Sequence, residues 1–247
     1  MALGVYEVLS ARESIDAEAL AHIFVRRFAE DPRRGYGPAM MDLFAQAAQG
    51  ASMAGLAQKL FDGTGSMGNG AAMRVAPVGA YFAHDLERAA LEARRSAEVT
   101  HAHPEGQAGA IAVAVATAWT WQWAASGRRE FPTELMRVAA EFTPAGATHD
   151  GIRAALEIPL DEWEFTVAEQ LGCGGKVTSP DTVPFCLWCA AAHLTDYPEA
   201  LWTGVRVGGD VDTTAAIIGG IVAMAVDIEG IPFAWRKTRE ELDWPKE

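Results

Sequence analysis

Alanine content and the spacing of apolar residues constrain the fold of this chain more than any other feature of its sequence. Forty-seven of the 247 residues are alanine, the residue with the highest helix propensity. Between residues 17 and 28 the apolar side chains recur at steps of three and four, which places them on one face of a helix. The alternating β-branched runs typical of strands are nearly absent. The sequence therefore predicts an all-α protein.

The same pattern predicts a series of helices separated by short loops. Asp31-Pro32 ends one of them, and Pro104 opens the longest at its first helical position. The expected ranges are 17–28, 38–48, 52–61, 71–82, 85–99, 104–125, 132–142, 149–156, 161–171, 182–194, 197–207 and 211–226. No internal repeat or long linker divides the chain, so we expect residues 1–247 to form a single compact domain.

Charge limits the partners that the chain can bind. Thirty-three acidic and 20 basic residues give a formal net charge of −13. A field of this sign repels phosphate backbones, so we do not expect nucleic-acid binding. An anionic small ligand requires helix N-termini or metal ions that offset the field locally.

The cysteine content and the longest apolar stretch of the sequence indicate where in the cell we expect the protein to be. Three cysteines are too few for a disulfide framework, and no signal peptide is evident, so we expect a cytoplasmic protein. Cys186 and Cys189 have CxxC spacing but lie in an apolar helical stretch, where we expect them to pack in the core. Residues 108–125 are mostly alanine with polar interruptions, which favours a buried helix over a membrane span.

The segment 208–214 (GGDVDTT) joins two predicted helices. Its glycines let the backbone turn, and Asp210, Asp212 and the Thr213 hydroxyl place three hard oxygen donors at the next helix start. Such donors suit Mg²⁺, Mn²⁺ or Ca²⁺, whereas an Asp at a helix start equally serves as a cap. The residues alone leave both interpretations open. They exclude an EF-hand, because its further acidic positions are missing.

A second glycine-rich segment, 63–70 (GTGSMGNG), also precedes a predicted helix. Its letters match a dinucleotide fingerprint, but that motif needs a preceding strand and here the preceding residues read as helix. No Lys-Ser/Thr follows, so it is not a Walker-type loop. Small residues ahead of a helix can expose backbone N–H groups that cradle a phosphate, and they also suit a loop that needs positive φ.

A third segment, 100–105 (THAHPE), holds His101 and His103 ahead of the longest predicted helix. Two histidines at this spacing can ligate a metal, but no third partner follows at a useful distance. We expect the segment to supply a polar contact to a ligand or a helix cap.

Together these segments resemble the ADP-ribosylglycohydrolase family, which includes the bacterial dinitrogenase reductase-activating glycohydrolase. The resemblance lies in residues 65–74 (GSMGNGAAMR), 100–105 and 209–213 (GDVDT), with 34–37 (RGYG) and 183–185 (VPF) also in the family's order. It implies the family's all-α fold. It also implies a centre of one or two Mg²⁺ ions, with Mn²⁺ as an alternative, that binds the distal ribose of ADP-ribose.

The resemblance further implies roles for individual residues. Asp210, Asp212 and Thr213 would ligate the metal. The implied substrate-binding residues are Gly65, Ser66, Met67, Gly68, Asn69 and His101. The implied chemistry is hydrolysis of an N- or O-glycosidic bond at the anomeric carbon of that ribose, in an ADP-ribosylated protein or a small conjugate.

The sequence departs from the family pattern at its first residues. In the family, an Asp-Asp-Thr segment precedes a helix similar to residues 1–5 (MALGV) and supplies further metal ligands, and an acidic residue implicated in catalysis lies upstream of it. This chain contains no Asp-Asp pair. The resemblance therefore implies a member shortened at its N-terminus, or a sequence that starts late, and it leaves the catalytic residue unassigned.

Two functions follow from the resemblance. One is a Mg²⁺-dependent hydrolase that removes ADP-ribose from a protein side chain or a small conjugate. The alternative is a catalytically impaired ADP-ribose-binding or regulatory protein. A purely structural role, with dimerisation through an apolar surface, is a third hypothesis, and the oligomeric state stays open. The sequence does not identify the linkage cleaved.

Overall fold

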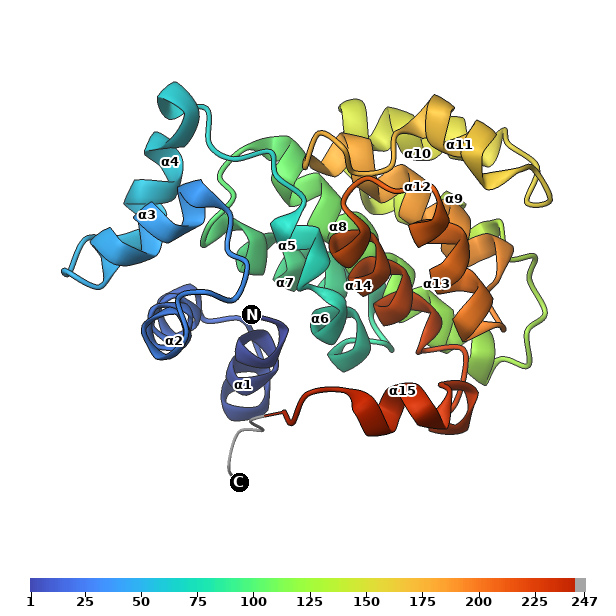
Figure 1. The fold of residues 1–247 in the computed structure, drawn as a ribbon, viewed down its shortest axis with the longest axis horizontal. Coiled ribbons are helices and arrows are strands. Elements are labelled where there is room, and N and C mark those ends of the chain that lie inside the picture. Colours follow the sequence, from blue (N-terminus) through green and yellow to red (C-terminus); the bar gives the residue numbers. More distant parts are fainter. Residues whose placement is uncertain (243–247) are drawn as a thin grey trace.

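The computed structural model describes residues 1–242, and helices account for most of them (Figure 1). The α-helices are α1 (Ala2–Arg12), α2 (Ala17–Glu30), α3 (Pro38–Ala47), α4 (Met53–Gly63), α5 (Gly70–Met73), α6 (Ala76–Tyr81), α7 (Leu86–Glu98), α8 (Pro104–Ala125), α9 (Glu134–Phe142), α10 (Ala147–Leu156), α11 (Glu164–Leu171), α12 (Ser179–Ala192), α13 (Tyr197–Arg206), α14 (Val211–Val222) and α15 (Phe233–Thr238), with a 3₁₀ turn at Ile228–Gly230. Within residues 1–242 there is no strand, and one isolated antiparallel bridge joins Gly68 to Thr178. The all-α prediction is confirmed.

Helix α8 lies at the centre of the fold and packs against α5, α6, α7, α9, α12 and α14. Fifteen of its 22 residues are buried, because its alanines and valines are apolar on every side of the helix. Two buried threonines remain satisfied, since Thr117 and Thr120 donate to the carbonyls of Val113 (2.7 Å) and Ala116 (2.8 Å). A helix of small residues lets its neighbours approach closely, and Gly79 of α6 meets the Ala114 carbonyl with no room for a Cβ.

Helices α1 to α4 flank this centre on one side (Figure 1). Aromatic contacts join α2, α3 and the loop between them: the ring centroids of Phe28 and Tyr36 each lie 5.5 Å from that of Phe44. Apolar residues of all four helices belong to the same buried cluster as those of α8, α12 and α14. At the other end of the described chain, an exposed ion pair between Arg34 and Glu240 links the segment after α15 to the α2–α3 loop.

Four helix predictions were wrong in detail. Helix α11 begins at Glu164, three residues later than expected. The expected helix 71–82 is divided into α5 and α6, because Pro77, in the first turn of α6, has no N–H to donate to a carbonyl of α5. Helix α12 begins at Ser179, three residues earlier than expected, with Pro180 in its first turn. Helix α14 ends at Val222, four residues earlier than expected. Helix α15 and the 3₁₀ turn were not predicted, and α1 was expected only through the family resemblance of residues 1–5.

The cysteines and the central helix lie as expected. Cys186 and Cys189 are free and fully buried, and burial raises the pKa of both thiols. None of the helices in residues 1–242 is both long and apolar enough to cross a membrane, which agrees with the prediction that residues 108–125 form a buried helix.

Candidate functional site

The glycine-rich loop between α4 and α5 lies directly against the start of α8. Gly63 and Gly65 have φ of 86° and 79°, the left-handed region that favours glycine. A Cβ on Gly65 would lie 2.5 Å from the His103 backbone nitrogen, and one on Gly106 would lie 2.6 Å from the Ser66 carbonyl oxygen. The glycines therefore serve two needs, a backbone turn and close contact with α8.

A short segment ahead of α12 pairs with this loop, and the sequence did not reveal it. The Ser179 N–H donates to the Met67 carbonyl (2.9 Å) and the Asn69 N–H to the Val177 carbonyl (3.3 Å), on either side of the Gly68–Thr178 bridge. The available signal was Pro180, which is typical of a first helical turn and could have placed the start of α12 here.

Several backbone N–H groups of the loop have no acceptor within residues 1–242, that of Gly70 at the start of α5 among them. The Gly68 N–H donates to Ser66 Oγ (3.2 Å), and Asn69 is paired as described. Those of Ser66 and Met67 have no acceptor within residues 1–242. A pair of adjacent free N–H groups suits an anionic oxygen.

Asn69 joins the loop to the start of α14. Its buried side-chain amide donates to Asp210 Oδ2 (2.7 Å) and to Thr182 Oγ1 (3.0 Å). Asp210 occupies the N-cap position of α14, yet its side chain makes no capping hydrogen bond. The capping interpretation therefore does not explain the Asp210 carboxylate, which faces Asn69, 141 residues earlier in the chain.

The other two predicted metal ligands lie beside Asp210 with different surroundings. Asp212 is exposed, whereas Thr213 is buried and its hydroxyl lies 3.4 Å from Met73 Sδ. No group of three or more His, Cys, Asp or Glu side chains in residues 1–242 could hold a metal ion. Two carboxylates and a hydroxyl are chemically suited to Mg²⁺, but they supply three of the six oxygens it takes. These residues do not form a complete metal site by themselves.

His101 borders the same loop from the side of α8. Its side chain is 3% exposed, and its Nδ1 lies 2.7 Å from the Thr100 hydroxyl. Burial and, secondarily, the positive charge of Arg74 lower the pKa of His101 to about 3, so its ring is neutral at pH 7. His103 points elsewhere and caps α8, because its Nδ1 accepts from the Glu105 N–H (3.0 Å). The two histidines therefore do not converge on one metal.

Arg74 contacts the end of the loop and has no carboxylate partner among residues 1–242. It is 3% exposed and donates to the Ser96 carbonyl (2.9 Å), the Thr100 hydroxyl (2.8 Å) and, more weakly, the Gly70 carbonyl (3.4 Å). Burial lowers its pKa to about 9, so it remains protonated at pH 7. A positive charge without a counter-ion offsets part of the acidic field at this point of the molecule.

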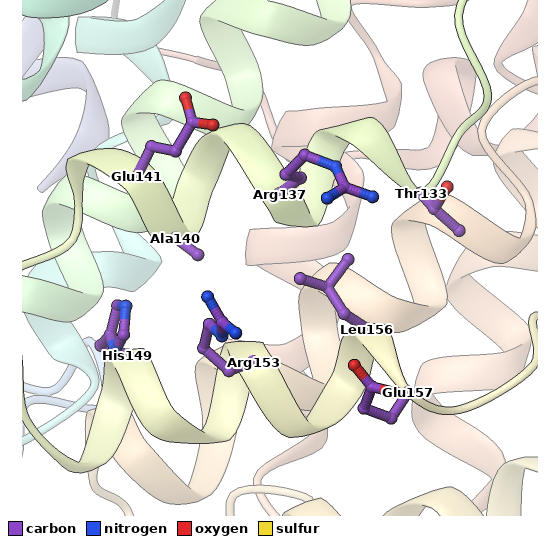
Figure 2. A pocket seen from close by; sticks show the side chains of 8 residues that line it. All are labelled: Thr133, Arg137, Ala140, Glu141, His149, Arg153, Leu156 and Glu157. Carbon is purple, nitrogen blue, oxygen red and sulfur yellow. The ribbon is translucent and has the colours of Figure 1, made fainter.

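A hollow of about 360 Å³ lies elsewhere, between α9 and α10 (Figure 2). Its lining consists of Thr133, Arg137, Ala140, Glu141, His149, Arg153, Leu156 and Glu157, none of which the sequence singled out. Both arginines are exposed, and Arg137 is paired with Glu134 (2.9 Å).

The contacts described above define the candidate site. It is the meeting point of four segments: the 63–70 loop, residues 100–101, residues 177–182 and residues 209–213.

Comparisons with known proteins agree with this architecture. The family model described as ADP-ribosylglycohydrolase matches residues 1–247. The ADP-ribosylhydrolase ARH3 of Bos taurus is 27% identical over 271 residues, covering 97% of this chain and 72% of that protein. The Homo sapiens ARH3 is 26% identical, covering 97% and 73%. A solved structure titled "ADP-ribosylglycohydrolase-related protein complex" superposes with a TM-score of 0.68 at 23% identity, covering 97% of this chain and 74% of that one, and so shares its fold.

Proposed function

Because the chain belongs to the ADP-ribosylglycohydrolase family, we propose that it binds an ADP-ribose conjugate at the meeting point of the four segments and hydrolyses the bond to the distal ribose. The observation that carries the proposal is the hydrogen bond from Asn69 to Asp210. It joins the glycine-rich loop to the start of α14 through a carboxylate that its own helix does not use. The Asn69 amide is buried, and a buried amide is costly unless it has hydrogen-bond partners such as this carboxylate.

The chemistry of the surrounding groups suits the parts of ADP-ribose. The free N–H groups of Ser66 and Met67 would donate to diphosphate oxygens, and the positive charge of Arg74, which contacts the end of the loop at Gly70, would favour the anion. The carboxylates of Asp210 and Asp212 would accept hydrogen bonds from ribose hydroxyls. In the net reaction, the oxygen of water bonds to the anomeric carbon and the glycosidic bond breaks. One proton of that water goes to the leaving nitrogen or oxygen, so the products are ADP-ribose and the free side chain, alcohol or carboxylic acid.

In this proposal, a metal ion binds at the site only when the ligand is also bound. Asp210, Asp212 and Thr213 would provide three oxygens to one Mg²⁺ or Mn²⁺, and ligand hydroxyls or water would provide the rest. When bound, such an ion would neutralise negative charge at the site and polarise oxygens that coordinate it. We therefore expect Mg²⁺ and ADP-ribose to bind cooperatively.

Thermal melting tests binding and metal dependence together. The protein is melted with and without ADP-ribose, each at zero and ~10 mM Mg²⁺, because ligand at ~100 Kd adds ~2.7 kcal/mol of stability. We expect the largest rise in Tm with both present. Asp210→Asn should abolish that cooperative rise, and Asp227→Asn, an exposed aspartate at the 3₁₀ turn, is the matched control. No rise for the unaltered protein under any condition would refute the proposed site.

A second function, ADP-ribose binding without hydrolysis, is favoured by one observation. Residues 1–242 contain no group of three or more His, Cys, Asp or Glu side chains that could hold a metal ion. Chromatographic detection of ADP-ribose released from arginine, serine and O-acetyl conjugates decides between the two functions. Release above the rate of the Asp210→Asn variant would establish a hydrolase and its linkage, whereas binding without release would establish the binder.

A further inference from the structure

The buried contacts of His101 specify which of its ring nitrogens carries the proton. Thr100 is fully buried, and its hydroxyl oxygen has two partners in the described chain: Arg74 Nη2 at 2.8 Å and His101 Nδ1 at 2.7 Å. A guanidinium has donors only, so the Thr100 oxygen accepts from Arg74. The open question is the direction of the second hydrogen bond.

Burial decides that direction. If His101 Nδ1 carried the proton and donated to Thr100, the Thr100 hydroxyl hydrogen would be buried with no acceptor among the described residues. A buried unsatisfied donor is strongly unfavourable. The hydroxyl therefore donates to Nδ1, and the proton of the neutral ring lies on Nε2.

The Nε2 edge of the ring faces the glycine-rich loop. A Cβ on Gly68 would lie 3.3 Å from Nε2, and one on Gly70 would lie 3.5 Å from it. Nε2 has no acceptor within residues 1–242. It is also absent from the fully buried side-chain atoms that lack a partner, so Nε2 itself is not fully buried. This edge therefore keeps a small contact with solvent beside the loop, where an incoming ligand would meet an N–H donor.

We infer that Thr100, held in place by Arg74, is a positioning residue that fixes His101 in the Nε2–H tautomer and presents it as a neutral hydrogen-bond donor to a ligand oxygen. This inference rests on the proposed function for the identity of the ligand. The arrangement sets His101 apart from a general base or a metal ligand, because the nitrogen that faces the site has a proton and no free lone pair.

The test compares two substitutions at the same buried position. Thr100→Val keeps the shape of the side chain and removes the hydroxyl, whereas Thr100→Ser keeps the hydroxyl and is the matched control. NMR spectra of the ¹⁵N-labelled histidine ring report the tautomer of His101 in the ligand-free protein. Calorimetric titration with ADP-ribose in the presence of Mg²⁺ reports the affinity of each variant.

We expect the His101 ring of the unaltered protein and of Thr100→Ser to carry a proton on Nε2 and none on Nδ1. Thr100→Val should give a mixture of tautomers and a Kd for ADP-ribose raised about tenfold, the scale of one lost hydrogen bond. A proton on Nδ1 in the unaltered protein would overturn the inference without any variant, and so would a Thr100→Val protein with unchanged tautomer and affinity. If the unaltered protein binds no ADP-ribose, the proposed function fails, and the ring spectra still decide whether Thr100 sets the tautomer.

Discussion

At the residue scale, the glycines of the 63–70 loop are distinguished by what surrounds them. Gly63 and Gly65 share a left-handed backbone, but a Cβ on Gly63 would meet nothing within 4 Å, whereas one on Gly65 would collide with His103 and Ala102. The pair therefore separates the cost of backbone strain from the cost of displacing the loop from α8.

We expect Gly63→Ala to reduce the free energy of unfolding by about 1–2 kcal/mol, the cost of a left-handed alanine. Gly65→Ala should add a steric cost of roughly 1–3 kcal/mol and should weaken ADP-ribose binding as well. Thermal melting and calorimetric titration measure the two effects. Equal stability losses for the two variants would show that the loop can move away from α8 freely.

The site residues were predictable to the extent that they share a local sequence motif. The loop, His101 and the start of α14 were predicted from such motifs, and the structure brings them together, while their roles stay predictions. The contributions of Thr182 and Thr100 were not predicted, because each depends on a hydrogen bond to a residue whose position only the fold fixes. Thr182 lies in the first turn of α12 and Thr100 in the turn after α7, and neither position predicts which side chain its hydroxyl will contact.

At the scale of elements, one carboxylate connects the starts of α8 and α10. Glu105, in the first turn of α8, accepts from the Ala147 N–H (2.7 Å), the Thr148 N–H (2.8 Å) and the Thr148 hydroxyl (2.6 Å). Partial burial acts to raise the pKa of Glu105, but the hydrogen bonds from Thr148 and Ala147 outweigh it and lower the pKa below the usual 4.5. The charged form of Glu105 therefore stabilises the folded state.

Glu105→Gln should reduce the free energy of unfolding by about 1 kcal/mol near neutral pH, a modest value because solvent screens the site. Since the folded pKa lies below the unfolded one, the advantage of the unaltered protein is complete above about pH 5 and is lost as the pH falls through the folded pKa. Urea unfolding between pH 3 and 7 measures this, with Glu141→Gln on the exposed side of α9 as the control. A difference that stays constant down to pH 3 would contradict the prediction.

Most helices were predicted from the periodicity of apolar residues and from capping residues. The predictions that were wrong have a common physical cause. Periodicity joined α5 and α6, because apolar residues lie on both sides of their junction, whereas the buried Arg74 at the junction is held by hydrogen bonds to Ser96 and Thr100 that the sequence does not reveal. The segment ahead of α12 pairs with a loop more than 100 residues away, and a single bridge leaves no alternating pattern in the sequence. Tertiary contacts determined the structure at both places.

At the scale of the whole molecule, residues from α1 to α14 form one buried apolar cluster. The prediction of a single domain over residues 1–247 includes five residues, 243–247, that lie outside the described part of the chain. We expect one cooperative unfolding transition, since helices that share a core lose their packing together.

Tryptophan fluorescence and far-UV circular dichroism, followed through the same urea titration, should give coincident midpoints. Differential scanning calorimetry provides the control, because the calorimetric and van't Hoff enthalpies agree only for a two-state transition. Two separate transitions would indicate that α1 to α4 unfold independently of the helices around α8.

Along the sequence, the loop between α8 and α9 separates the segments that form the candidate site into two groups. It contains Gly127 and Arg128, both with positive φ, and Phe131, which is 80% exposed. Residues before it supply Asn69 and His101, and residues after it supply Thr182 and Asp210. If the gene were cut at this loop, each fragment would encode half of the binding surface, and ADP-ribose would then report the reassembly of the two fragments, as in a split reporter.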